Sequence, residues 1–146
     1  MSQVATYRSE ICLGQPEPGQ SMEELPGWEI LRQAVETVAE ERGGRVTHQV
    51  TDYFGRQYSV DFGLVTPDFP RGLGIKVSRV TGEVRVMYDA YGGYEGTARS
   101  LLESIQQNYS ALAVARALQE MHYQVELEEV TGEGEQGKLV LVRGEL

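Results

Sequence analysis

The stretch from Leu73 to Glu95 constrains the fold of this chain more than any other part of the sequence. Apolar and polar residues alternate on both sides of Thr81-Gly82, which is typical of two antiparallel strands joined by a tight turn. A two-residue turn there would form three apolar pairs, namely Val77 with Val86, Ile75 with Tyr88 and Leu73 with Ala90. These residues would share one face, because successive side chains of a strand alternate between its faces. The pattern therefore predicts a β-hairpin with one buried face.

The opposite face of this hairpin carries the first candidate site. It would hold Arg85, Met87, Asp89 and, just beyond the strand, Tyr91. A turn rich in glycine follows, and Tyr94 lies at its end. Because tyrosine and arginine are enriched at protein interfaces, we expect Arg85, Asp89, Tyr91 and Tyr94 to form a partner-binding surface. Packing of the two tyrosines over the start of the next helix would explain them equally well.

A second hairpin is predicted earlier in the chain, around a three-residue loop at Phe54-Gly55-Arg56. That loop would pair Val50 with Val60, His48 with Phe62 and Val46 with Leu64. The face is mostly apolar, so His48 is expected to be a core histidine.

The other segments predict helices and further strands. Apolar residues at helical spacing predict helices over about 26–42 and 96–121. Asn108 and Ser110 could cap a further helix, so the second is expected to be continuous with a kink or split in two. The stripe of the first helix consists of Trp28, Leu31, Val35 and Val38. Further strands are expected over 3–13, 123–130 and 138–143. His122 would end the second helix in a left-handed conformation.

This order of elements predicts an α+β fold. We expect a mainly antiparallel β-sheet built from hairpins, packed against one N-terminal helix and a long or split second helix. A chain of 146 residues can bury a core and is short enough for one domain, so residues 1–146 are expected to form a single domain.

Charge and composition restrict the classes of partner. The net charge of −9 and the lack of a dense basic stripe argue against binding to nucleic acid. Residues 42–99 have eight basic and six acidic side chains, which leaves room for a small local anion site. No apolar run approaches the roughly 20 residues of a membrane span, and no secretion signal is evident. A single cysteine, Cys12, fits a reducing compartment, so a cytoplasmic location is expected.

No constellation of catalytic or metal-ligating residues stands out. His48, His122 and Cys12 lack the paired spacing of a metal site, and Cys12 is expected to be packed and inert. The sequence indicates no cofactor. Asp61 and Asp89 are the carboxylates of interest, because both fall in predicted strands rather than loops. Each is expected to point to solvent on the face opposite the apolar one, and a functional role is the alternative.

Several short motifs are similar to those of a known family. They are Ser2, Thr6 and Tyr7 near the N-terminus, Tyr53-x-Gly55-Arg56-Gln57, Leu73-Gly74-Ile75, a strand that ends at Asp89, Gln107-Asn108-Tyr109-Ser110, and Tyr123-x-Val125. In this order they resemble the hypothetical chloroplast reading frame thirty-five family, whose bacterial relatives are grouped as a domain of unknown function. The segment 14–20 departs from that pattern as an insertion, and His122 stands where the family usually has Gly. The resemblance implies a fold and a soluble bacterial or plastid setting, without a reaction.

Two functions are therefore expected in parallel. The first is a small non-enzymatic accessory protein that acts through another protein. The alternative is a small-molecule or anion-binding domain, or an enzyme, with its site at the Gly92–Gly96 helix entry and Asp61 or Asp89 as acid or base. A pocket that holds both carboxylates would favour the alternative, whereas an exposed patch would favour the first function.

Overall fold

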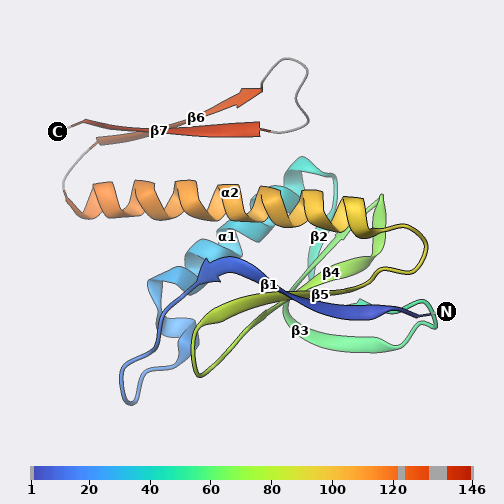
Figure 1. Cartoon of the computed structure of the whole chain (residues 1–146). Helices are drawn as coiled ribbons and strands as arrows, with labels where there is room; N and C mark the ends of the chain where they lie inside the picture. Colours follow the sequence, from blue (N-terminus) through green and yellow to red (C-terminus); the bar gives the residue numbers. More distant parts are fainter. Residues whose placement is uncertain (1, 122–123, 132–137, 146) are drawn as a thin grey trace.

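The computed structural model describes residues 2–121, 124–131 and 138–145, with side chains described for residues 2–121. The elements are β1 (Val4–Cys12), η1 (Met22–Glu24), α1 (Pro26–Glu41), β2 (Arg45–Thr51), β3 (Gln57–Thr66), β4 (Phe69–Val77), β5 (Glu83–Asp89), α2 (Glu95–Glu120), β6 (Gln124–Thr131) and β7 (Lys138–Glu145). The first five strands form an antiparallel sheet in the order β1-β5-β4-β3-β2 (Figure 1). The expected α+β fold with two helices is confirmed.

The strands β6 and β7 pair with each other in a separate two-stranded sheet. This hairpin lies along α2, on the side of the helix that faces away from the five-stranded sheet (Figure 1). His122, and with it the predicted left-handed helix stop, lies outside the described residues.

Both helices bury an apolar stripe against the same face of the sheet. In α1, Leu31, Val35 and Val38 are fully buried, as their helical spacing predicts, and Trp28 packs its ring 5.2 Å from that of Phe62. Pro26 occupies the first turn of α1, where its missing N–H leaves no helical hydrogen bond unmade.

The second helix, α2, is continuous. Asn108 does not split it, because the side-chain amide donates a hydrogen bond to the Ser104 carbonyl one turn earlier, at 2.8 Å. Leu101 and Ile105 are buried on the side of this helix that packs on the core. The two helices and the sheet thus enclose the apolar core.

The β4–β5 hairpin has a longer turn than the sequence predicted. Ile75 pairs with Val86 and Val77 pairs with Val84, so the register differs from the expected one by two residues. The connection runs from Ser78 to Glu83, and Gly82 takes a φ of 76°, which a residue with a side chain rarely adopts. The predicted faces survive, because side chains alternate with a period of two and a shift of two residues preserves them.

The β2–β3 hairpin is irregular in its middle. Val46 pairs with Leu64 as predicted, but Val50 pairs with Tyr58 because the register shifts between Thr47 and Gln49. His48 sits in this irregularity and is exposed, with Nδ1 3.0 Å from the Asp61 carbonyl oxygen. The prediction of a core histidine was therefore wrong. Cys12 is also exposed rather than packed.

The five-stranded sheet is strongly curved at its β2–β3 end. The β2–β3 hairpin thereby covers part of the sheet face that the helices do not cover. Val50 and Val60 are buried there, close to glycines of β4. A Cβ atom at Gly74 would lie 2.7 Å from Val60 Cγ1 and 2.9 Å from Met87 Cγ, so only glycine allows this approach. The fold-over brings the hairpin tip, residues 52–56, onto the C-terminal end of β5.

Candidate functional site

Asp89, the last residue of β5, is buried where the hairpin tip meets the sheet. Its carboxylate accepts hydrogen bonds from the N–H groups of Gln3 (2.7 Å), Tyr53 (2.7 Å) and Tyr91 (3.0 Å), and from the Ser2 hydroxyl (2.9 Å). The side chain is fully screened from solvent. Asp89 therefore joins two segments that are distant in sequence, the N-terminus and the β2–β3 tip, to the loop that directly follows β5.

The hydrogen bonds to Asp89 determine its protonation state. Burial alone would raise the pKa of this carboxyl, but the N–H donors of Gln3, Tyr91 and Tyr53 and the Ser2 hydroxyl outweigh it and hold the pKa far below its usual range. Asp89 is consequently a carboxylate throughout the neutral range. Its oxygens are occupied by donors, so it is poorly suited to accept a proton in catalysis.

Arg71, near the start of β4, supplies the opposite charge. Its Nη1 lies 3.3 Å from Asp89 Oδ2, and its Nη2 donates a hydrogen bond to the Tyr91 carbonyl. The guanidinium lies over the Tyr94 ring at 4.8 Å and over the Tyr53 ring at 5.8 Å. Such cation–π contacts fix the planar guanidinium between the two aromatic rings.

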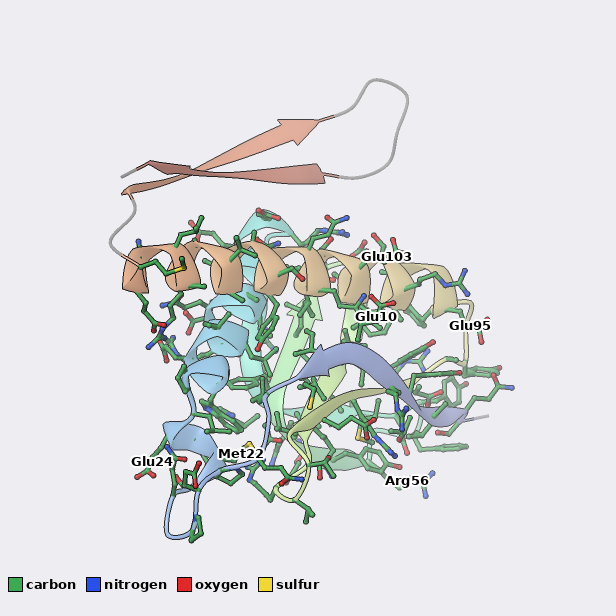
Figure 2. The ribbon with its side chains drawn as sticks, turned by 60° about the vertical axis from the view of Figure 1, so that its left-hand side comes forward. Glu10, Met22, Glu24, Arg56, Glu95 and Glu103 are labelled. Carbon is green, nitrogen blue, oxygen red and sulfur yellow. The ribbon has the colours of Figure 1, made fainter. Side chains whose placement is uncertain are left out.

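Above this ion pair, three aromatic side chains reach the solvent. The Tyr53 ring lies 4.6 Å from that of Tyr91 and 5.3 Å from that of Phe54. The exposed fractions are 63% for Phe54, 51% for Tyr53 and 36% for Tyr91. We call Tyr53, Phe54 and Tyr91 the aromatic surface. Arg56 borders it, with its guanidinium 5.5 Å from the Phe54 ring, and projects from the periphery of the molecule (Figure 2).

A second buried carboxylate, Asp52, fixes the loop that carries this surface. Its Oδ1 accepts the N–H groups of Phe54 and Arg56, both at 2.9 Å. Its Oδ2 accepts Arg56 Nε at 2.7 Å and the Tyr58 hydroxyl at 3.0 Å. Burial opposes the charge of Asp52, but these donors lower the pKa, and Asp52 in turn raises the pKa of Tyr58. Two carboxylates therefore hold the exposed tip from below.

The structure brings together three of the four residues predicted to bind a partner. Asp89, Tyr91 and Tyr94 all surround Arg71, but only Tyr91 is exposed. Tyr94 is half-buried, with its ring 5.3 Å from that of Phe69. Asp89 does not face the solvent as predicted, because the β2–β3 tip covers the face of β5 to which it belongs.

Arg85 lies apart from this cluster. It is exposed on the same face of β5, four residues before Asp89, and its Nη2 is 3.2 Å from Glu83. Four strand residues span about 13 Å, so Arg85 is too far along the strand to share the site. The structure therefore does not place Arg85 on the aromatic surface.

Sequence reasoning did not identify Tyr53, Phe54 and Arg71. The available signal was the position of two aromatic residues at the tip of a predicted hairpin, where polar turn residues are the rule. Nothing local in the sequence marks Arg71, because its partners come from three other segments.

Asp61 is separate from Asp89. Its Oδ2 accepts the N–H of Val77 at 2.7 Å, and its Oδ1 lies 2.7 Å from Arg79 Nη2. Val77 ends β4, whereas Arg71 and Asp89 meet near the beginning of that strand. The two carboxylates therefore serve opposite ends of β4 and do not form one acid–base pair.

A small pocket lies beside the entry to α2. Its volume is about 240 Å³, and its walls include Tyr7, Tyr88 and Leu102, with Glu95 and Arg99 at the helix side. The Tyr7 and Tyr88 rings stack at 5.5 Å. Burial, with a smaller contribution from Tyr7, raises the pKa of Tyr88 to about 12, so its hydroxyl stays protonated at neutral pH.

We also searched the described part of the chain for metal sites and for membrane-spanning helices. Within the described ranges, no group of three or more His, Cys, Asp or Glu side chains is arranged to hold a metal ion. None of the described helices is both long and apolar enough to cross a membrane. Comparison of the chain with family models, with curated proteins and with solved structures finds no match.

Proposed function

We propose that this is a small accessory protein without enzymatic activity, which acts by binding another protein through the aromatic surface. The observation that carries the proposal is the position of Tyr53 and Phe54. They are strongly exposed, although the loop that presents them is fixed by two buried carboxylates. Turns usually carry Gly, Pro, Asn, Asp or Ser, and a cluster of exposed apolar side chains often marks an interaction site.

The hydrogen bonds that fix the tip favour recognition. Binding costs less when the contact residues are already ordered, because little conformational entropy remains to be lost. Tyrosine, phenylalanine and arginine provide large contact areas with few rotatable bonds, and a few such anchors usually dominate the affinity of an interface. Arg71 and Arg56 lie against the same rings and add charge at the edge of the surface.

The hydrogen bonding at the site supports binding rather than proton transfer. Both oxygens of Asp89 and both oxygens of Asp52 are occupied by donors. The pKa of each carboxyl is lowered, so neither is matched to general acid–base chemistry near neutral pH.

Substitution of the exposed rings tests the proposal. The double variant Tyr53→Ser, Phe54→Ser should lower the melting temperature only slightly, since the backbone N–H of Tyr53 that binds Asp89 is retained. It should nevertheless recover far less of any partner that co-purifies with the wild type. Val80→Ser is the matched control, because Val80 is 77% exposed and lies in the β4–β5 turn. Equal recovery by the double variant and the wild type would contradict the proposal.

A small-molecule binding function is the second candidate, supported by the pocket beside α2. Most of its lining residues are apolar or aromatic, and Glu95, which also lines it, belongs to the Gly92–Gly96 segment. Glu95 and Arg99 lie on the helix side of this pocket, where their charges can bind a polar group of a ligand. Ligand-detected NMR with phenylalanine, whose ring would fit between the tyrosine side and Leu102, tests this candidate. Leu102→Trp should fill the pocket and abolish any binding seen.

The cytoplasm is the compartment we propose. Cys12 is a free, exposed thiol, and exposed unpaired cysteines are typical of reducing compartments. We also propose that the chain is related to the chloroplast reading frame thirty-five family and its bacterial relatives, on the basis of the short motifs described above.

A further inference from the structure

A groove with a volume of about 550 Å³ runs along β2, the strand at one edge of the five-stranded sheet. In the described part of the chain, β2 pairs only with β3, so the other side of its backbone has no partner strand. On either side of the irregularity at His48, an open edge of this kind presents N–H and C=O groups with which another extended chain can pair. The groove is lined by β2 from Arg45 to Thr51, by residues of the neighbouring strand β3, and by Pro70 and Arg71 at the start of β4.

The chemistry of the groove differs from that of the whole chain. The net charge of the protein is −9, yet the residues that line the groove include Arg45, His48 and Arg71 and no aspartate or glutamate. Arg71 is already paired with Asp89. Arg45 has no ion-pair partner among the described residues. The groove therefore favours the binding of a negatively charged group.

The groove is continuous with the aromatic surface. The chain passes from Thr51, at the end of the groove, to Asp52 and then to Tyr53. Arg71 belongs to both sites, because it lines the groove and also lies against the Tyr53 ring. One extended ligand could thus contact the edge of β2 and reach the exposed rings.

We propose that β2 receives an extended acidic segment of the partner protein as an additional strand, with an apolar or aromatic residue of that segment on the aromatic surface. This inference rests on the proposed function and specifies the kind of partner. Main-chain hydrogen bonds to β2 provide affinity, and carboxylates near Arg45 provide selectivity for acidic sequences. Tyr53 and Phe54 receive the anchor residue.

A polynucleotide fits the same groove less well. Single-stranded nucleic acid needs a track of cations along its backbone. Among the described residues, this groove has one arginine without an ion-pair partner, Arg45, and one histidine. The acidic remainder of the chain repels phosphates at longer range. An acidic peptide needs fewer cations, because the edge of β2 supplies main-chain hydrogen bonds.

The test uses the full-length protein and a defined probe. The probe is a fluorescent peptide of about eight residues that alternates Glu with Val and ends in Trp, which matches the two-residue period of a strand. The comparison peptides replace every Glu with Gln, or place Pro at alternate positions to remove main-chain donors. Fluorescence anisotropy should show binding of the acidic probe that weakens as salt is raised. The Gln peptide should bind more weakly and the Pro peptide not at all.

Two charge-reversed variants locate the binding. Arg45→Glu should weaken binding of the acidic probe by roughly tenfold or more, because it replaces attraction by repulsion within the groove. Lys76→Glu is the matched control, since Lys76 is exposed in β4 outside the groove and gives the same change of net charge. It should alter the affinity by less than about twofold. Amide NMR shifts on titration should fall on β2 and the hairpin tip, and Arg45→Ala provides a milder variant if Arg45→Glu does not fold.

The outcomes separate this inference from the proposed function. Absence of binding by the acidic probe, equal effects of the two charge reversals, or amide shifts away from β2 would each overturn the inference. So would tighter binding by a single-stranded oligonucleotide than by the peptide. A further outcome is that capture of a natural partner is lost in the Tyr53→Ser, Phe54→Ser variant but kept in Arg45→Glu. That result would support partner binding by the aromatic surface and would contradict the addition of a strand to β2. If the peptide binds along β2 but the Tyr53→Ser, Phe54→Ser variant recovers as much partner as the wild type, the proposed function is contradicted instead.

Discussion

Tyr53 donates its backbone N–H to Oδ2 of Asp89 at 2.7 Å, across 36 positions of the sequence. This hydrogen bond fastens the tip of the β2–β3 hairpin to the end of β5. Through it, a buried acidic residue controls the position of the exposed rings of Tyr53 and Phe54. The stability of the fold and the shape of the candidate binding surface thus depend on the same carboxylate.

Loss of the Asp89 charge should be strongly destabilising. Asp89→Asn keeps the size of the side chain but turns one acceptor oxygen into a donor, which opposes the N–H groups that surround it and leaves Arg71 unpaired. Breaking a buried pair of this kind costs about 3–5 kcal/mol. Urea unfolding would measure the change in the free energy of unfolding. Glu103→Gln is the control, because Glu103 is exposed on α2 and should change stability by less than about 0.5 kcal/mol.

Asp89 should also govern stability in acid. Its pKa is lower in the folded protein than in the unfolded chain, where it is about 3.9, so the unfolded state takes up protons first as the pH falls. The stabilisation by Asp89 is complete above about pH 5 and is lost as the pH drops below about 4. The difference in unfolding free energy between the wild type and Asp89→Asn should therefore be constant from pH 5 to pH 7 and should shrink in acid. A difference that grows in acid would show that the carboxyl is not stabilised as an anion.

The approach of the β2–β3 hairpin to β4 should require glycine at position 74. Gly74→Ala would place a methyl group 2.7 Å from Val60 Cγ1, and Val60 is buried in a strand and cannot withdraw freely. Overpacking of this kind costs about 1–3 kcal/mol. Gly96→Ala is the control with the same chemical change, because a Cβ there meets no atom within 4 Å and the residue is helical. It should leave stability unchanged or raise it by up to about 1 kcal/mol. Thermal melts of the two variants distinguish them, and equal behaviour would mean that the hairpin does not close over Gly74 in solution.

The packing of α1 on the sheet gives a prediction about the core. Leu31→Ala removes a fully buried side chain and should cost about 2–5 kcal/mol, through lost transfer free energy and the cavity that remains. Val114→Ala on the exposed side of α2 should cost much less. A loss below roughly 0.5 kcal/mol for Leu31→Ala would make α1 peripheral to the fold.

Much of the fold follows from local patterns in the sequence. The α1 stripe of Leu31, Val35 and Val38 and the faces of β5 are set by helical and strand periodicity, which depends only on neighbouring residues. The β4–β5 turn was less predictable, because Thr81-Gly82 fits a two-residue turn as well as the end of a longer one. The predicted register was wrong by two residues, and an even shift leaves each side chain on the face of the strand that was predicted for it.

The candidate site was only partly predictable, because it depends on how the sheet curves. Alternation placed Asp89 opposite the core, which is correct for the strand. Its burial arises from the β2–β3 hairpin, whose fold-over depends on Gly72 and Gly74 and on a register shift near His48. No local pattern relates Tyr53 to Asp89, so the contact that defines the surface appears only in three dimensions.

Site-specific photo-crosslinking from the aromatic surface tests its role most directly. A benzophenone amino acid at position 54, introduced into the full-length protein in its native cell, would stand where Phe54 is 63% exposed. The same group at position 80 or 114 would be similarly accessible on other surfaces. If the aromatic surface binds a partner protein, light should produce a discrete crosslinked species from position 54 that is absent from positions 80 and 114 and is lost when Tyr91→Ser is added. No crosslink at position 54, or the same species from all three positions, would contradict a binding role for this surface.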